Sequence, residues 1–227
     1  MNEIRVGIIG FGTVGKGLAE VLLAQQERLV RRTGMSIRLA GIADHGTDAL
    51  PERFSHVPLT RDARDLISDP KIDIIVELIG GIEPAKTFVL QAIASGKHVV
   101  TANKALLSQE GAEIFAAAAA KSVEVGFEAS VGGGIPVIKS LKEGLVANRI
   151  LSIMGIMNGT ANYILTRMTD EGIPFAEVLA EAQRLGFAEA DPSYDIEGID
   201  TAHKLAILMS MAYGMPITHR EIATEGI

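Results

Sequence analysis

Apolar residues follow two alternating patterns along the first 130 residues. Short uninterrupted runs of Ile, Val and Ala alternate with longer stretches in which apolar residues return every three or four positions. The first pattern predicts buried strands and the second predicts amphipathic helices. Strands are expected at 4–9, 37–43, 72–79, 98–102 and 123–128, and helices at 14–33, 61–68, 84–95 and 106–121. This alternation is typical of an α/β domain with a doubly wound parallel sheet.

The pattern changes near residue 130, at the glycine-rich segment VGGGIP of residues 131–136. One strand is expected beyond it, at 149–157, with helices at 158–168, 174–185 and 199–213. We therefore predict two domains, 1–130 and a smaller α+β domain at 131–227. A single strand cannot form a sheet, so we expect further chain or another subunit to complete the second domain.

A glycine-rich turn directly follows the first predicted strand. Residues 4–15 read IRVGIIGFGTVG, a G-x-G-x-x-G pattern between a strand and a helix. Its glycines permit a tight turn, a close approach of phosphates and close packing of the helix, whose N-terminus attracts a dinucleotide pyrophosphate. A Rossmann-type, NAD(P)-binding domain is predicted, and a glycine turn without a ligand is the alternative. The expected binding residues are Gly10, Phe11, Gly12, Thr13, Val14 and Gly15.

Two further strand ends carry candidate cofactor contacts. Asp44 ends the second strand, where an acid can bind the adenosine ribose and repel a 2′-phosphate. This favours NAD, but the neighbouring His45 leaves NADP open, and a solvated turn aspartate is an equal alternative. Gly80 follows Glu77 at the end of the third strand, at the edge of the sheet where ligands bind. A plain turn explains this glycine equally well.

Two lysines are candidates for chemistry. Lys104 follows the strand at 98–102 and is expected at the same edge of the sheet, although a surface lysine is the simpler interpretation. Asp200 and Lys204 are four residues apart and share one face of the helix at 199–213. A lysine beside a carboxylate and near a second lysine could transfer protons. Spacing alone favours a surface ion pair.

Composition removes several classes of function. The net charge is −7 and basic residues never cluster beyond a pair, so we expect no nucleic-acid partner. We also expect no signal peptide and no membrane span, and hence a soluble cytoplasmic protein. The chain has no cysteine, which excludes disulfides, iron–sulfur clusters and aldehyde oxidation through a cysteine thiohemiacetal. The five histidines lack metal-ligand spacing, so zinc is not expected.

Taken together, these segments resemble homoserine dehydrogenase. The resemblance extends from about residue 4 to residue 208, and its last segment is the most specific because no generic Rossmann protein needs it. The matching segments are GFGTVG, ELIGG, TANKALL, EASVGGGIPVI, GIMNGTANYIL and RLGFAEADPSYDIEGIDTAHKLAIL.

The resemblance implies NAD(P)-dependent interconversion of L-homoserine and L-aspartate 4-semialdehyde, on the route to threonine, methionine and isoleucine. It implies that Lys204 is the proton donor, that Lys104 is a second active-site lysine against the cofactor, and that Glu189 and Asp200 bind the homoserine end. It also implies a sodium site, largely of main-chain oxygens, and we expect a homodimer. The residues implied around sodium are Glu128, Val131, Gly133 and Ile135.

The family continues well beyond Ile227, and the resemblance implies that this further chain adds strands to the second domain and a helix to the first. Two alternative functions follow. One is another Rossmann reductase acting on a different carbonyl, against which the segment at 184–208 argues. The other is a non-catalytic NAD(P)-binding or assembly protein derived from the same fold.

Overall fold

The computed structural model describes residues 3–227, which form two compact units divided between Ser130 and Val131. We call them unit 1 and unit 2. Each has its own cluster of buried apolar side chains. Among the described residues, no helix combines the length and the apolar character that crossing a bilayer requires.

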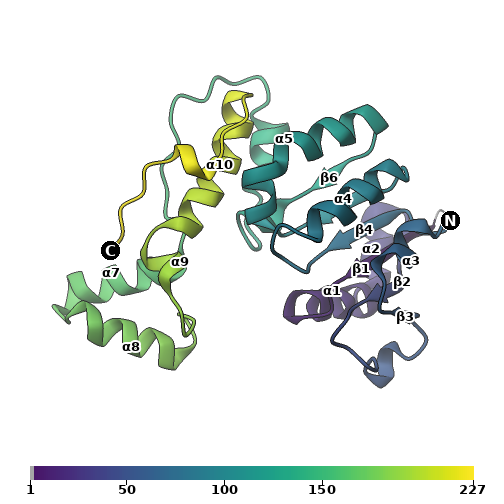
Figure 1. Ribbon diagram of the computed structural model, residues 1–227, viewed down its shortest axis with the longest axis horizontal. Coiled ribbons are helices and arrows are strands. Elements are labelled where there is room, and N and C mark those ends of the chain that lie inside the picture. Colours follow the sequence, from purple (N-terminus) through teal and green to yellow (C-terminus); the bar gives the residue numbers. More distant parts are fainter. Residues whose placement is uncertain (1–2) are drawn as a thin grey trace. The chain divides into compact units, whose positions relative to one another are not determined.

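Unit 1 is built on a parallel sheet that, within residues 3–227, has six strands in the order β3-β2-β1-β4-β5-β6 (Figure 1). This is the strand order of the doubly wound dinucleotide-binding fold, and it confirms the predicted fold class. The strands are β1 (Glu3–Ile9), β2 (Ser36–Ala43), β3 (Leu59–Thr60), β4 (Ile74–Glu77), β5 (His98–Thr101) and β6 (Val125–Gly126). The helices are α1 (Thr13–Ala24), α2 (Gln26–Thr33), α3 (Ala63–Ser68), α4 (Ala85–Ala94) and α5 (Lys104–Lys121).

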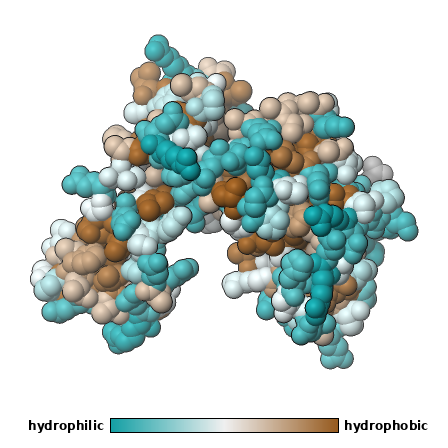
Figure 2. Space-filling view, viewed as in Figure 1, coloured by the Kyte–Doolittle hydropathy of each residue, from teal (hydrophilic) through white to brown (hydrophobic). Residues whose placement is uncertain are grey.

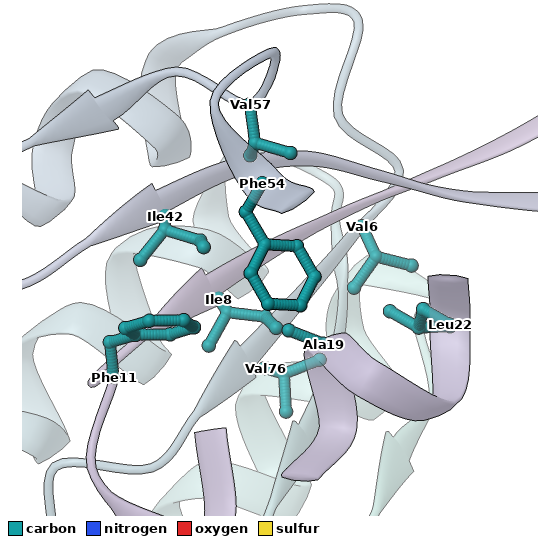
Figure 3. Packing of buried hydrophobic residues seen from close by; sticks show 9 residues of the cluster. All are labelled: Val6, Ile8, Phe11, Ala19, Leu22, Ile42, Phe54, Val57 and Val76. Atoms are coloured by element: carbon teal, nitrogen blue, oxygen red, sulfur yellow. The ribbon is translucent and has the colours of Figure 1, made fainter. Parts of the chain in front are cut away.

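A cluster of apolar side chains fixes α1 against the sheet. Side chains of β1, β2 and β4 meet those of α1 and of a short 3-10 turn, Glu52–Phe54 (Figure 3). The rings of Phe11 and Phe54 meet edge to face, with centroids 6.1 Å apart. Because Phe11 lies inside the G-x-G-x-x-G turn, this core also holds the turn in place. Its buried members are Val6, Ile8, Phe11, Ala19, Leu22, Ile42, Phe54, Val57 and Val76.

The opposite face of the sheet is covered by α3, α4 and α5, which pack side by side. Successive side chains of a strand point to opposite faces, so Gly41 faces away from the cluster that contains Ile42. A Cβ at Gly41 would lie 2.6 Å from Cδ2 of Leu66 on α3, so this glycine allows the helix to approach β2. Helices on both faces make the sheet doubly wound.

Several predicted boundaries in unit 1 differ from the structure. The helix expected at 14–33 is two helices, α1 and α2, because Gln25 leaves the helical conformation with φ −109° and ψ 15°. Neither proline nor glycine marks this break, so the sequence carried no local signal of it. β4 and β6 are shorter than expected, because strands extend only where a neighbour pairs with them, and β6 pairs with β5 at two positions.

All regular secondary structure in the described residues of unit 2 is helical. Its helices are α6 (Val137–Lys139), α7 (Gly159–Glu171), α8 (Phe175–Leu185), α9 (Ser193–Ile196) and α10 (Ile199–Tyr213). A π-helical turn, Ser140–Gly144, continues α6, and a 3-10 turn lies at His219–Glu221. α7 and α8 lie side by side and enclose Ile164, Val178 and Ala182 (Figure 1). Apolar atoms also reach the surface around these two helices (Figure 2).

The strand predicted at 149–157 is wrong. This segment has no regular secondary structure, and within the described residues no strand pairs with it. Leu151, Met154 and Ile156 are at least 78% exposed. A strand is stable only where a neighbour satisfies its main-chain N–H and C=O groups, and an apolar alternation by itself does not supply that neighbour.

Candidate functional site

The three glycines of the turn between β1 and α1 have different surroundings. Gly10 has φ +101°, and a Cβ on it would lie 2.8 Å from main-chain atoms of Leu78. A Cβ on Gly15 would lie 2.1 Å from the oxygen of Gly10. No atom lies within 4 Å of the place where a Cβ of Gly12 would be. Gly10 and Gly15 are therefore required by the fold, whereas Gly12 leaves open space above the turn.

The N-terminus of α1 suits an anion. Its N-cap, Gly12, has no side chain that could accept the first N–H groups, and the first turn contains no acidic residue. Thr13 and Val14 are exposed, so the main chain that carries these N–H groups lies at the surface. Together with the positive end of the dipole of a 12-residue helix, these groups fit the pyrophosphate of a dinucleotide.

Asp44 ties the glycine turn to the end of β2. Its Oδ2 accepts a hydrogen bond of 2.7 Å from the N–H of Phe11, and its Oδ1 accepts one of 2.9 Å from the N–H of Gly46. Burial raises the pKa of this carboxyl, but hydrogen bonds from Phe11, Thr47 and Gly46 outweigh it and hold the pKa below its ordinary value. The side chain is thus an anion at neutral pH. It shapes the turn and keeps lone pairs that ribose hydroxyls can use.

Glu77 organises the loop after β4. It is fully buried, and its Oε1 accepts from the N–H groups of Ile79 and Gly80 at 2.9 and 3.1 Å. Its Oε2 accepts from the hydroxyl of Thr101 at the end of β5, at 2.6 Å. The carboxylate therefore joins two neighbouring strand ends and places Gly80 at the carboxyl edge of the sheet, where ligands bind in this fold.

Glu77→Ala is expected to destabilise unit 1 by at least about 2 kcal/mol, because it leaves the buried hydroxyl of Thr101 and the N–H groups of Ile79 and Gly80 without their acceptor. Denaturant unfolding followed by circular dichroism measures the loss. Glu83→Ala is the matched control, since Glu83 is exposed and its carboxylate accepts from the nearby hydroxyl of Thr87. Equal unfolding midpoints for the two variants would contradict the role given to Glu77.

Lys104 is the first residue of α5 and is half-buried. The buried N-cap Asn103 fixes the start of this helix. Its Oδ1 accepts from the N–H of Leu106 at 3.1 Å, and its Nδ2 donates to the oxygen of Gly81 at 2.6 Å. Lys104 and the loop after β4 thus share one anchor at the carboxyl edge of the sheet.

In unit 2, α10 carries a largely buried ion pair. The Nζ of Lys204 lies 2.8 Å from Oδ2 of Asp200, and the two side chains are 19% and 7% exposed. The same Nζ donates to the main-chain oxygen of Met157 at 2.8 Å. Burial distinguishes this pair from the surface ion pair that spacing alone favoured. These two acceptors use two of the three N–H bonds of the ammonium.

Two further residues were not predicted as site residues: Asn158, which is hydrogen-bonded to Asp200, and Asp195, which is hydrogen-bonded to Asn158. The Oδ1 of Asn158 caps α7 by accepting from the N–H of Ala161 at 2.7 Å. Its Nδ2 also donates to Oδ1 of Asp195 at 2.7 Å and to Oδ2 of Asp200 at 3.0 Å. A local N-cap pattern contains no information about such partners, because they lie 37 and 42 residues away.

The remaining predicted residues are placed as follows. The carboxylate of Glu189 is exposed in the loop after α8, and Gln183 anchors this loop by donating to the main-chain oxygen of Glu189 at 3.1 Å. Glu128 lies in a 3-10 turn at the end of unit 1, whereas Val131, Gly133 and Ile135 open unit 2. No group of three or more His, Cys, Asp or Glu side chains among residues 3–227 forms a metal site. This finding does not test the expected sodium site, because that site is formed largely by main-chain oxygens.

Two family models match the chain in succession. The model described as "Homoserine dehydrogenase, NAD binding domain" matches residues 10–128, and the model described as "Homoserine dehydrogenase" matches residues 136–227. Homoserine dehydrogenase of Pseudomonas aeruginosa is 52% identical over the whole chain, and that of Bacillus subtilis is 43% identical. The chain covers 52% and 53% of these proteins, so it spans about half the length of the curated relatives it matches.

Solved structures give the same result. A homoserine dehydrogenase from Thiobacillus denitrificans superposes with a TM-score of 0.94 at 56% identity, over all of this chain and 53% of that one. A hyperthermophilic archaeal homoserine dehydrogenase in complex with NADPH superposes with a TM-score of 0.82 at 29% identity, over 97% of this chain and 75% of that one.

Proposed function

This chain belongs to the homoserine dehydrogenase family, and from that premise we propose that it carries the cofactor turn and the proton donor for the NAD(P)-dependent interconversion of L-homoserine and L-aspartate 4-semialdehyde. The observation that carries the proposal is the ammonium of Lys204, held in largely buried surroundings by Asp200 and by the main-chain oxygen of Met157. The reaction serves the synthesis of threonine, methionine and isoleucine.

Each residue has a defined part in the reduction of the aldehyde. A reduced nicotinamide, when bound, supplies the hydride that adds to the aldehyde carbon. Negative charge then develops on the aldehyde oxygen, where the third N–H of Lys204 donates a hydrogen bond and then its proton, forming the hydroxyl. Asp200 accepts a hydrogen bond from the ammonium and orients it. We assign Lys104 as a second cation beside the cofactor, and Glu189 with Asp200 as partners of the substrate ammonium group.

We assign the cofactor to the turn between β1 and α1. Gly12, Thr13 and Val14 would face the pyrophosphate, and Asp44 the adenosine ribose. Phe11 contributes differently, because its side chain lies in the core and its N–H is bonded to Asp44. The related archaeal enzyme was solved with NADPH, yet the anionic Asp44 favours NAD in this chain, because a 2′-phosphate beside a carboxylate is repelled.

Asp44→Asn is expected to shift the ratio of NADP to NAD affinity toward NADP by about tenfold or more, equivalent to about 1.4 kcal/mol. Asparagine removes the negative charge and still offers an oxygen to the N–H of Phe11, so the turn is kept. Titrations with both reduced cofactors measure the ratio. Asp48→Asn, at an exposed aspartate of the following loop, is the control. An unchanged ratio in Asp44→Asn would remove Asp44 from ribose recognition.

Absorbance of the reduced nicotinamide, at about 340 nm, tests the proposed function directly. With L-homoserine and either oxidised cofactor, we expect a homoserine-dependent increase. A protein that binds NADP or NAD but shows no increase with any alcohol would support the non-catalytic alternative. An increase with other hydroxy acids but not with homoserine would support a different Rossmann reductase.

The proposal also includes a sodium ion, a homodimer and a cytoplasmic location. Main-chain oxygens of Val131, Gly133 and Ile135 with the carboxylate of Glu128 are hard ligands that suit such a cation. Repeating the assay with sodium replaced by choline tests the ion. Light scattering of the protein as it elutes from a size-exclusion column tests the dimer. Activity that is equal in both salts would argue against sodium.

A further inference from the structure

We infer that Asn158 is a positioning residue for the ammonium of Lys204. It acts through the two groups that accept hydrogen bonds from this ammonium, Asp200 and the main-chain oxygen of Met157. The inference deepens the proposed function and rests on it, because that proposal assigns the ammonium of Lys204 as the proton donor. Asn158 is 8% exposed and lies between three elements: it caps α7, and its side chain reaches Asp195 of α9 and Asp200 of α10.

The orientation of the amide is fixed by its partners. The N–H of Ala161 requires an acceptor, so Oδ1 faces α7. Nδ2 then faces two carboxylate oxygens, at 2.7 and 3.0 Å, and both of its N–H bonds are used. The opposite orientation would place an oxygen against two carboxylates and an NH2 group against an N–H. One uncharged side chain therefore joins two carboxylates that would otherwise repel each other.

Both acceptors of Lys204 depend on this residue. Oδ2 of Asp200 receives hydrogen bonds from Asn158 and from Lys204, so the amide fixes the oxygen that orients the ammonium. The other acceptor is the main-chain oxygen of Met157, which belongs to the peptide bond between Met157 and Asn158. The side chain and the main chain of Asn158 thus determine where the two acceptors lie. The positions of these acceptors set the direction of the third N–H of the Lys204 ammonium.

Asn158→Asp and Asn158→Ser separate capping from positioning. Aspartate and serine are both good N-caps, so each keeps an acceptor for the N–H of Ala161. Both variants lack the NH2 group, and serine avoids a third carboxylate. We expect kcat to fall by about 10- to 100-fold in both, because a shifted proton donor loses its alignment with the substrate. The affinity for the reduced cofactor is expected to change little. The melting temperature is expected to fall in both variants, and further in Asn158→Asp, because the carboxylates of Asp195 and Asp200 lose this donor and aspartate adds a third carboxylate beside them.

A second measurement does not depend on activity. An ammonium held by two acceptors exchanges its protons slowly, so Lys204 is expected to give an observable 1H–15N signal, assigned by its loss in Lys204→Arg. Both Asn158 variants are expected to broaden this signal. Lys97 is the internal control, because its Nζ is buried in unit 1 and donates to the oxygens of Asp69 and Ile72, each at 2.6 Å.

Asn162→Asp is the matched control variant, since it makes the same chemical change at an exposed position one turn further along α7. It is expected to leave kcat and both signals unchanged. An unchanged Lys204 signal in both Asn158 variants would show that Asn158 only caps the helix and would overturn the inference. Loss of the Lys97 signal as well would do the same by indicating general damage. If the unaltered protein does not oxidise homoserine, the proposed function fails and the signal alone decides the inference.

Discussion

Lys204→Ala is expected to lower kcat by about 10²- to 10⁴-fold while the affinity for the reduced cofactor stays unchanged. The range is that of a lost general acid. Asp200 would remain largely buried with Asn158 as its hydrogen-bond donor, so the variant removes the proton and the positive charge but keeps the scaffold. Steady-state kinetics in the direction of aldehyde reduction, together with cofactor titration, measure the two quantities separately.

Lys204→Arg distinguishes charge from proton transfer. Arginine keeps the cation but does not release a proton in the accessible pH range. If Lys204 acts only by stabilising the developing oxyanion, Lys204→Arg keeps most of the activity, whereas a proton donor loses it. Lys121→Ala, at an exposed lysine that ends α5, controls for the loss of a positive charge. Normal turnover in Lys204→Ala would remove this residue from the mechanism.

Gly15→Ala is expected to destabilise unit 1 by about 3 kcal/mol or more, at the upper end of overpacking effects. The added Cβ would lie 2.1 Å from the oxygen of Gly10. The main chain at Gly10 is held on both sides, so this oxygen cannot easily shift away. The N–H of Gly10 is bonded to the oxygen of Ala43, and Leu78 closes its other side. The chain has no tryptophan, and its tyrosines all lie in unit 2, so amide hydrogen exchange in β1 is the suitable measurement.

Gly12→Ala is the partner variant, with the opposite expectation. No atom lies within 4 Å of the new Cβ, and φ is −72°, a value that any residue adopts, so protection in β1 should not change. The methyl group occupies the open space above the turn, so the Kd for the reduced cofactor should rise about tenfold or more, equivalent to about 1.4 kcal/mol. Unaltered cofactor binding in Gly12→Ala would mean that the pyrophosphate does not lie on this turn.

The correctly predicted elements are those that carry their own local signals. α10 begins and ends where the sequence places it, because apolar periodicity and the following Gly214 define it locally. α7 begins at Gly159, one residue from its predicted start, because a local signal also marks this helix start. The break at Gln25 and the absence of a strand at 149–157 were not predicted, because packing decides the first and a pairing partner decides the second.

The resemblance to homoserine dehydrogenase supplied the residues proposed for proton transfer. The sequence by itself determined the alternation of strands and helices over most of unit 1 and the glycine turn. These features depend on spacing along the chain and on conformations available to single residues. The tertiary structure alone decided which groups surround these residues. Glu77 meets Thr101, and Asn158 meets Asp195 and Asp200, across 24 to 42 residues of chain. Buried polar groups must find partners, and folding selects those partners by proximity in space.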